Sequence, residues 1–419
     1  MKPNSASIPA FTAYQKFVVA ILAFLQFTII LDFMILSPLG AMLMPALQIN
    51  PSQFGLVVSV YAFSAGTSGL LAAGFADRFD RKKLLLFFYA GFLLGTFLCG
   101  IAPTYHFLLA ARMITGIFGG VMGSIVMAIT TDLFSFQMRG RVMGFIQTSF
   151  AASQILGIPM GLFLANHFGW HMPFLMIVGI GLAMGLVILN YLKPINEHLK
   201  LKVDHSAFHH FKTTLTNSRY LIAFGATALL SIGGFMLMPF SSAFTVNNIG
   251  ISIEKLPMIY FITGLCAIFI GPLVGKLSDR FGKYNVFVAG SLLSVVMIFI
   301  YTNLGVTPLP WVILVNVILF AGIFTRMIPS QALMSAVPAP SSRGSFMSVS
   351  SSLQQIAGGF ASMLAGLIVS RGPDGKIEHF ERVGYVMFGT ISISIVLMYF
   401  IHRMVREDNR EQTQKTQQK

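Results

Sequence analysis

The amino-acid sequence predicts an all-α membrane protein with twelve transmembrane helices in two pseudo-symmetric six-helix bundles. Three observations support this: an apolar composition, twelve apolar runs of membrane-spanning length, and a charged motif that occurs once in each half. Of the 419 residues, 55% are hydrophobic and 10% are charged, against about a quarter charged in a soluble domain. Mean hydropathy is +0.77. This composition excludes an ordinary soluble enzyme, a disordered chain and a disulfide-stapled secreted domain.

The apolar runs have roughly the 20 residues that a helix needs to cross a bilayer. Pro, Gly or charged residues separate them. The first run is too long for the hydrophobic region of a signal peptide, so we interpret it as a retained span. In chain order, the predicted spans cover residues 17–44, 53–76, 84–103, 107–134, 141–166, 169–192, 220–246, 256–277, 285–304, 310–335, 344–370 and 383–404.

One long polar stretch divides the chain after the sixth span. The sequence therefore predicts four segments: an N-terminal six-helix bundle (1–192), a cytoplasmic linker (193–219), a C-terminal six-helix bundle (220–404) and a cytoplasmic tail (405–419).

The net charge of +14 is explained by membrane topology. With the N-terminus inside, 22 of the 28 Lys and Arg residues fall on the inner side and four on the outer side. Cytoplasmic segments of membrane proteins carry such an excess of positive charge, so both termini are expected in the cytoplasm. The basic residues flank apolar spans, and we expect no nucleic-acid partner.

A charged motif closes the second span and recurs at the end of the eighth. The first copy is Gly-Phe-Ala-Asp-Arg-Phe-Asp-Arg-Lys-Lys at 74–83, and the second is Gly-Lys-Leu-Ser-Asp-Arg-Phe-Gly-Lys at 275–283. An Arg-Gly pair at 139–140 likewise recurs at 343–344. The nearly equal offsets, 201 and 204 positions, indicate a duplicated six-helix unit, which is typical of transporters built from two related halves.

At these residues the chain resembles the major facilitator superfamily over nearly its whole length, from Phe17 to Met404. Segment 74–83 matches the signature that this superfamily carries between its second and third helices. The run Arg-x-x-x-Gly-x-x-x-Gly at 112–120 resembles the arginine motif of its proton-coupled members. The resemblance implies two bundles that rock about a midplane cavity.

Two further segments resemble the bacterial drug:proton antiporter branch. Gly-Ile-Pro-Met-Gly at 157–161 is similar to the glycine–proline motif of these antiporters, although that motif has Gly directly before Pro and this chain has Ile158. Leu-Asp-Phe-Met at 31–34, followed by Pro-Leu-Gly at 38–40, is most similar to bacterial drug-efflux relatives.

Asp32 is the only acidic residue well inside a predicted span, because Asp132 lies at the cytoplasmic end of the fourth. An Asp near the bilayer centre is costly unless it is paired or faces water. Such a carboxylate can bind and release a proton as its surroundings alternate, so Asp32 is predicted to couple transport to protons. The alternative is a role in helix packing alone.

Arg112 is the expected partner of Asp32. At the rise of an α-helix, Asp32 lies roughly 23 Å and Arg112 roughly 20 Å from the cytoplasmic side. The resemblance places their helices side by side. The alternative for Arg112 is hydrogen bonding to helix carbonyl groups, and the two roles are compatible.

The repeated charged motifs are predicted to gate the cytoplasmic side. Glycine lets helices approach closely, and an Asp is stabilised near the N-terminus of a neighbouring helix. Arg78 and Arg81 are expected to pair with Asp132 and lock the outward-open state. The predicted gating residues are Gly74, Asp77, Arg78, Arg81, Asp132, Gly275, Asp279 and Arg280.

Arg326 lies in a C-terminal span without an acidic partner in any span of that half. It is expected either to bind an anionic substrate or to bond backbone carbonyl groups near Pro329. Glutamines of the fifth and eleventh spans could line the same cavity or bond between helices. The predicted cavity residues are Arg326, Gln147, Gln154 and Gln355.

Small residues of the fourth and fifth spans are predicted to allow close helix packing. For the fifth and eleventh spans, that packing is expected at the interface between the halves. The packing residues are Gly116, Gly120, Gly157, Pro159 and Gly161.

The leading functional hypothesis is secondary active transport: proton-coupled efflux of small hydrophobic or drug-like compounds by alternating access. One alternative is an exporter or importer of one specific metabolite, such as a siderophore, sugar or organic anion. Another is a non-transporting membrane receptor or scaffold. No catalytic motif or metal-ligand spacing is visible, so no enzyme, metal or cofactor is expected. The expected partners are a small-molecule substrate, protons and the lipid bilayer, with a monomer in the plasma membrane, specifically a bacterial inner membrane.

Overall fold

The computed structural model describes residues 10–72, 79–200, 216–338 and 343–417. Within these ranges, eleven helices are long and apolar enough to cross a membrane. They correspond to eleven of the twelve predicted spans. The remaining span is helix α15 (Arg343–Ile368), which has the required length but is rich in Ser, Gln and Gly. The all-α fold with two six-helix halves is therefore as the sequence predicts.

Two elements, α6 and α7, together form the fifth span of the N-terminal half. The helices of this half are α1 (Ala13–Ile35), α2 (Gly40–Ala46), α3 (Pro51–Ala72), α4 (Arg81–Gly100), α5 (Tyr105–Leu133), α6 (Phe136–Ala152), the π-helical turn η2 (Ser153–Gly157), α7 (Ile158–Phe168) and α8 (Met172–Tyr191). A short 3₁₀ turn, η3 (Glu197–Lys200), follows in the linker.

The C-terminal half repeats this order and adds one small hairpin. Its elements are α10 (Ser218–Phe235), α11 (Ser241–Asn247), the 3₁₀ turn η4 (Ile253–Lys255), α12 (Leu256–Phe281), α13 (Lys283–Thr302), α14 (Leu309–Ser335), α15, strands β1 (Ser370–Arg371) and β2 (Ile377–Glu378), and α16 (Phe380–Gln417). The antiparallel strands pair Ser370 with Glu378 and Arg371 with Ile377. The sequence did not predict this hairpin.

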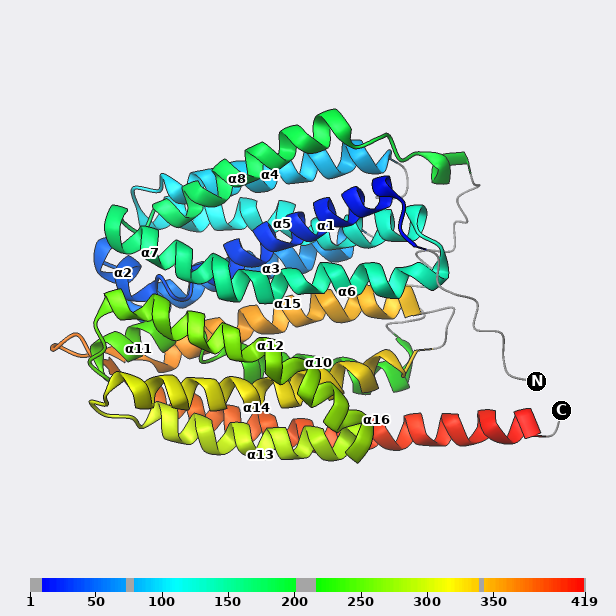
Figure 1. Cartoon of the computed structure of the whole chain (residues 1–419). Coiled ribbons are helices and arrows are strands. Elements are labelled where there is room, and N and C mark those ends of the chain that lie inside the picture. The colour runs from blue at the N-terminus through cyan, green and yellow to red at the C-terminus, as the bar shows by residue number, and fades with distance from the viewer. Residues whose placement is uncertain (1–9, 73–78, 201–215, 339–342, 418–419) are drawn as a thin grey trace.

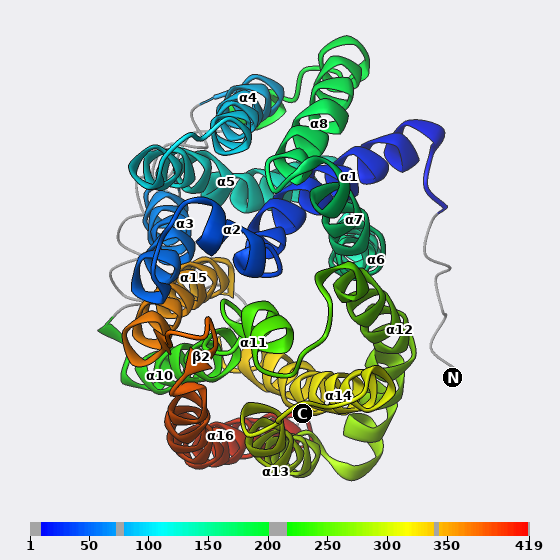
Figure 2. The same ribbon diagram turned by 90° about the vertical axis from the view of Figure 1, so that its left-hand side faces the viewer.

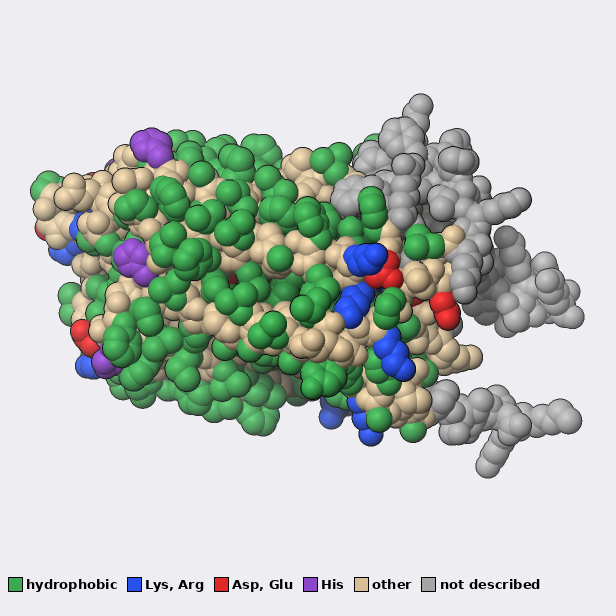
Figure 3. Space-filling model, turned by 90° about the horizontal axis from the view of Figure 1, so that it is seen from above, with side chains coloured by type: hydrophobic (Ala, Val, Ile, Leu, Met, Phe, Trp, Pro, Cys, Tyr) green, Lys and Arg blue, Asp and Glu red, His purple; other side chains and the backbone are tan. Residues whose placement is uncertain are grey.

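Both chain ends lie at one end of the elongated bundle, and α2 and α11 lie at the other (Figure 1). Viewed along the helices, the N-terminal half occupies one side and the C-terminal half the other (Figure 2). α3 lies beside α15, and α7 lies beside α12. Hydrophobic side chains cover most of the face in Figure 3, and Lys and Arg gather toward the end that carries the termini.

The first and seventh predicted spans are not continuous helices. α1 ends at Ile35 and α2 begins at Gly40, while α10 ends at Phe235 and α11 begins at Ser241. Pro38 and Pro239 lie in these breaks, 201 positions apart. Proline has no N–H to donate and disfavours the α conformation of the residue before it, so each helix ends there. The prediction of unbroken helices over 17–44 and 220–246 was wrong.

The two short helices beyond these breaks bring the halves into contact. The Ser242 hydroxyl of α11 donates a hydrogen bond to the Ser37 carbonyl oxygen, at 3.0 Å. The rings of Phe54 and Phe240 meet edge to face, with centroids 5.9 Å apart. At this end of the bundle, opposite the termini, the halves are therefore joined.

The fifth span widens into a π-helical turn directly before Pro159. A proline inside an α-helix removes a hydrogen bond and crowds the carbonyl group one turn earlier, and a π-turn accommodates that disruption. Two serines fix this span against α1. The Ser149 hydroxyl donates to the Ala23 carbonyl at 2.6 Å, and the Ser153 hydroxyl donates to the Phe27 carbonyl at 3.2 Å.

The last helix is longer than the predicted span 383–404, because α16 continues through the predicted tail to Gln417. Two ion pairs support the extension. Arg403 pairs with Glu407 one turn later at 2.8 Å, and Asp408 pairs with Arg219 at the start of α10 at 2.9 Å. Pairs at this helical spacing stabilise an exposed helix.

The close contact between the halves runs along α3 and α15, where glycines allow the backbones to meet. The Ser59 hydroxyl donates to the Gly359 carbonyl at 2.8 Å. A Cβ atom on Gly55 would lie 2.7 Å from the Ser362 carbonyl oxygen, and one on Gly366 would lie 3.0 Å from the Pro51 carbonyl oxygen. Small residues permit such approach between membrane helices.

The packing prediction for the fifth span needs a correction. Cβ atoms on Gly157 and Gly161 would meet the side chains of Leu31 and Ile35 on α1, at 2.6 and 2.7 Å. These glycines therefore pack inside the N-terminal half rather than between the halves. The span does reach the other half elsewhere, because η2 lies against α12.

We predict that Gly55→Ala destabilises the protein by about 1–3 kcal/mol, the usual cost of overpacking. The new methyl group would meet backbone atoms of α15, which cannot turn aside as a side chain can. Gly389→Ala is the control, because nothing lies within 4 Å of a Cβ atom at that helical position. Thermal unfolding in detergent measures both. Equal melting temperatures for the two variants would contradict the close α3–α15 contact.

Candidate functional site

Asp32 and Arg112 meet in the core of the N-terminal half. Asp32 lies on α1 and Arg112 on α5, and the side chains of both are fully buried. The Arg112 Nη1 donates to the Asp32 Oδ2 at 2.7 Å. The predicted pairing at matching depth is thus present. A buried ion pair is stable only while both members stay paired, because either charge left alone in a medium of low dielectric is costly.

Two further contacts of the pair come from residues that the sequence analysis missed. The Thr96 hydroxyl on α4 donates to the Asp32 Oδ1 at 3.2 Å. The Arg112 guanidinium lies over the Tyr61 ring of α3, 4.4 Å from its centroid, in a cation–π contact. A single Thr or Tyr in an apolar span carries no distinguishing signal, so only the fold could find them.

The Arg112 guanidinium donates a single hydrogen bond to Asp32, through Nη1. Its Nε and Nη2 atoms are buried and have no hydrogen-bond partner among the residues that the structure describes. Carboxylate–arginine pairs are strongest when two parallel hydrogen bonds form. Because a single hydrogen bond joins Arg112 to Asp32, neutralising the Asp32 carboxylate is enough to weaken the contact.

The predicted packing glycines of α5 set the position of Arg112. A Cβ atom on Gly116 would lie 2.5 Å from the Tyr61 carbonyl oxygen, and one on Gly120 would clash with the Ala65 backbone. Without these glycines, α5 could not approach α3 closely enough for Arg112 to reach the Tyr61 ring. The glycines that follow Arg112 thus have a packing role, as predicted from the sequence.

At the end of the bundle that carries the termini, Arg81 pairs with Asp132. The Arg81 Nε lies 2.9 Å from the Asp132 Oδ2, and the Arg81 side chain is 5% exposed. The pair joins α4 to α5, so it lies within the N-terminal half and does not bridge the halves. The predicted Arg81–Asp132 contact is present, and its role in locking the outward-open state stays a prediction.

Asp80 organises the same region and was not singled out from the sequence. Its Oδ1 accepts from the Lys83 N–H at 3.0 Å and caps α4, while its Oδ2 accepts from the Ile195 N–H at 3.0 Å. An Asp three residues before the accepted N–H is a recognisable capping pattern. This contact fixes the start of the linker to α4.

Only some of the other predicted gating residues lie within the described ranges. Gly74, Asp77 and Arg78 lie outside the described residues. Asp279 and Arg280 are exposed at the end of α12, and neither forms an ion pair with any residue in the described ranges. The nearby Gly275 has no atom within 4 Å of a Cβ position.

The four predicted cavity residues occupy different environments. Arg326 on α14 and Gln154 on η2 are buried, Gln355 on α15 is half-buried, and Gln147 on α6 is exposed. No hydrogen bond joins any two of them within the part of the chain that is described. The Arg326 Nε and Nη2 have no partner there either, so the expected bonding to carbonyl groups near Pro329 is not observed for these atoms.

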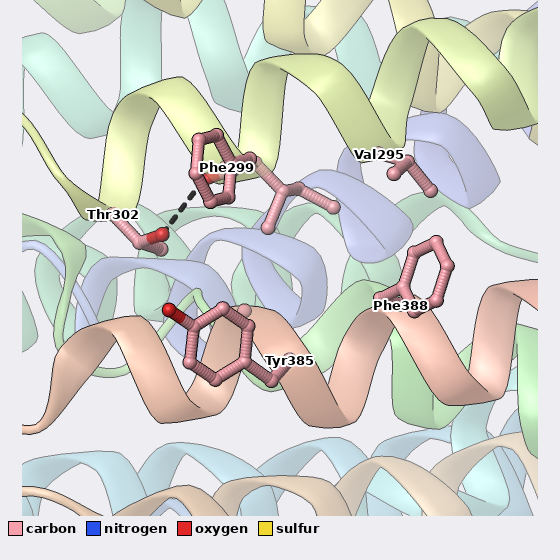
Figure 4. A pocket seen from close by; sticks show the side chains of 7 residues that line it. Val295, Phe299, Thr302, Tyr385 and Phe388 are labelled. Atoms are coloured by element: carbon pink, nitrogen blue, oxygen red, sulfur yellow. Dashed lines mark hydrogen bonds between the residues drawn. The ribbon is translucent and has the colours of Figure 1, made fainter.

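A small apolar pocket of about 70 Å³ lies between α13 and α16 (Figure 4). Phe299, Tyr385 and Phe388 are more than half exposed, so the pocket opens on the outer surface of the bundle. None of the predicted site residues lines it. The lining residues are Val295, Ile298, Phe299, Thr302, Gly384, Tyr385 and Phe388.

Two six-helix halves, one of which encloses a buried Asp–Arg ion pair, form the fold of a polytopic membrane protein. The sequence matches the Major Facilitator Superfamily over residues 22–362 and 223–419. The chain belongs to the major facilitator superfamily and is a transporter of that fold.

Two relatives from Bacillus subtilis (strain 168) align along most of the chain. The uncharacterized MFS-type transporter YceJ is 25% identical over 391 residues, which cover 93% of this chain and 96% of that protein. Multidrug resistance protein 2 is 22% identical over 392 residues, covering 91% and 95%.

Solved structures show the same fold. A nucleoside transporter, NupG, superposes with a TM-score of 0.73 at 15% identity, covering 93% of this chain and 99% of that chain. A bacterial homolog of the human lysosomal transporter Spinster, inward-facing and occupied, has a TM-score of 0.70 at 14% identity, covering 96% and 98%. At these identities the likeness concerns the fold alone.

We predict strong coupling between Asp32 and Arg112 in a double-mutant cycle. Asp32→Leu or Arg112→Leu alone leaves one buried charge unpaired and should cost about 3–5 kcal/mol of stability. The double variant removes both charges and should be more stable than the sum of the single effects allows. Thermal unfolding of the purified protein measures the cycle. Additive effects would show that the pair contributes nothing as a pair.

Proposed function

We propose that this protein is a proton-coupled exporter of small hydrophobic or drug-like compounds that works by alternating access. The observation that carries the proposal is the fully buried, singly bonded Asp32–Arg112 pair. A proton on Asp32 neutralises the carboxylate and weakens its attraction to Arg112. The Tyr61 ring then remains as a described contact of the guanidinium. A proton thereby releases α1 from α5.

The position of the pair links that release to movement of the halves. Three residues beyond Asp32, α1 ends at Ile35. The chain then passes through the Pro38 turn into α2, which contacts α11 of the other half. Phe33, next to Asp32, meets Phe235 of α10 with ring centroids 5.8 Å apart. A movement of α1 that follows loss of the Asp32–Arg112 contact would therefore act on the contact between the halves, through α2 and through Phe33.

The resemblance of segment 157–161 to drug:proton antiporters and the match to multidrug resistance protein 2 support the substrate class and direction. Two relatives that align along most of the chain come from Bacillus subtilis. Together with the charge asymmetry they support a bacterial plasma-membrane protein, an inner-membrane protein, with both termini in the cytoplasm. A receptor or scaffold would have no need of a buried ion pair that can be released.

We predict that Asp32→Asn abolishes uphill transport driven by a pH gradient and leaves passive exchange. The amide mimics the protonated carboxyl group and cannot release a proton. Proteoliposomes loaded with ethidium or fluorescein, with an imposed pH gradient, measure both modes.

Asp374→Asn is the control for loss of one acidic charge. Asp374 lies in the loop between β1 and β2, where hydrogen bonding to Lys376 holds the pKa of its carboxyl group below the usual value. This variant should transport as wild type does. Coupling through Asp32 is falsified if Asp32→Asn accumulates dye against its gradient as well as wild type. A wild-type protein that moves neither dye would contradict the exporter assignment itself.

We also propose that Arg81 and Asp132 resist separation of the α4 and α5 ends during the transport cycle. Arg81→Gln or Asp132→Asn should raise labelling of a cysteine at position 147 by a membrane-impermeant maleimide from the cytoplasmic side, and should slow dye flux. The experiment uses a protein that also carries Cys99→Ala and Cys266→Ala, so that the introduced cysteine is the one that is labelled. Because Arg81 is buried, loss of its partner should cost more than loss of an exposed pair.

Arg219→Gln serves as the matched control, because it breaks the exposed Arg219–Asp408 pair. Labelling and flux should then stay at wild-type levels. If the Arg81 and Asp132 variants behave like this control, the pair has no part in gating.

A further inference from the structure

The two halves differ at the position of the buried acid. Helices α2 and α11 begin and end 201 positions apart, and the prolines before them have the same offset. With this register, Asp32 on α1 corresponds to Gly233 on α10. The C-terminal half therefore has no side chain at the place where the N-terminal half has its carboxylate.

Gly233 faces a buried cation. A Cβ atom at Gly233 would lie 3.7 Å from the Arg326 Nη2. Arg326 belongs to α14, the fourth helix of its half, as Arg112 belongs to the fourth helix of the other. Each half thus directs an arginine of its fourth helix toward its first helix, and only the N-terminal half supplies the matching acid.

No acidic side chain pairs with Arg326 among the residues that the structure describes. The residue is 4% exposed, and its Nε and Nη2 are buried without a hydrogen-bond partner among the residues described. The Thr390 hydroxyl, 3.1 Å from the Cβ position of Gly233, donates to the Met387 carbonyl of its own helix. An arginine buried in this way is costly unless an anion joins it.

Apolar side chains also lie near this position. Ile391 of α16 lies 3.6 Å from the Gly233 Cβ position, and Phe235 of α10 packs on Gly358 of α15. Phe235 also contacts Phe33, the neighbour of Asp32. A ligand that places a negative group at Arg326 would therefore set its remaining atoms among aromatic and aliphatic side chains.

We propose that Arg326 binds the negatively charged group of a transported organic anion, at the face of α10 that carries Gly233, the position that corresponds in register to Asp32 of the other half. This inference rests on the proposed transport function and names the substrate class: small apolar molecules that carry one carboxylate or a similar anionic group. With such a ligand bound, each half contains one neutralised arginine between its first and fourth helices.

A substitution tests the site without knowledge of the natural substrate. Gly233→Asp places a carboxylate at the position of the proposed ligand, and Gly233→Asn places an uncharged group of nearly the same size there. Both variants bear the same crowding against Thr390. We expect Gly233→Asp to melt at a higher temperature than Gly233→Asn, and the difference to vanish in an Arg326→Gln background. Equal melting temperatures for the two variants in the wild-type background would overturn the proposal.

Binding to the purified full-length protein provides the second arm, with 2-naphthoate and its uncharged analogue 2-naphthamide as probes. Hydrogen bonds to a charged group favour the anion by about tenfold or more, so naphthoate should bind at least that much more tightly than naphthamide. Arg326→Gln and Gly233→Asp should each remove this preference. Equal affinity of wild type for both probes would overturn the proposal. Titration needs no pH gradient, so a failure of proton coupling leaves this result unaffected.

A lipid headgroup is the other source of an anion in a membrane. The titration is therefore repeated in nanodiscs of phosphatidylcholine with and without phosphatidylglycerol. Unchanged naphthoate affinity supports a substrate site. Displacement of naphthoate by phosphatidylglycerol would assign the site to lipid and overturn the assignment to substrate.

Discussion

The structure of the N-terminal half depends on the need to keep Asp32 and Arg112 together away from water. Both are fully buried, and the cost of separating them in a medium of low dielectric is large. Four helices meet around the pair: α1 and α5 supply the charges, α4 supplies Thr96 and α3 supplies the Tyr61 ring. The arrangement constrains the positions of all four helices, and in the proposed mechanism a proton on Asp32 releases it.

Close approach of the helices makes this geometry possible. Gly116 and Gly120 allow α5 to lie against α3, and Gly157 allows the fifth span to lie against Leu31, next to Asp32. Between the halves, Gly55 and Gly359 do the same for α3 and α15. Lipid gives little hydrophobic drive for helices to associate, so packing at small residues carries much of the association. Packing inside each half and packing between halves therefore use the same residue type.

The duplicated halves have diverged in charge while keeping their backbone plan. Pro38 and Pro239 break the first helix of each half at matching places, and the short helices beyond them contact each other. Of these two corresponding positions, only the one in the N-terminal half carries an acid, because Gly233 corresponds to Asp32 in the C-terminal half. Arg326 is left with a buried charge and no described partner for two of its nitrogen atoms. The two halves thus share a backbone plan and differ in the buried charged residues that they carry.

The sequence alone determined the class of protein, the approximate spans and the Asp32–Arg112 pair, because apolar length, helical rise and the cost of an isolated charge are local or one-dimensional quantities. It did not determine the breaks at 36–39 and 236–240, because a proline can bend a helix or end it according to its neighbours. The sequence also predicted that Gly157 and Gly161 pack between the halves, whereas they pack against α1. A glycine indicates that some helix approaches closely, but it does not identify that helix. Tyr61, Thr96 and the Gly233–Arg326 contact join residues from different helices. Only the tertiary structure could bring these together, because such contacts depend on how helices far apart in the chain rotate and pack against one another.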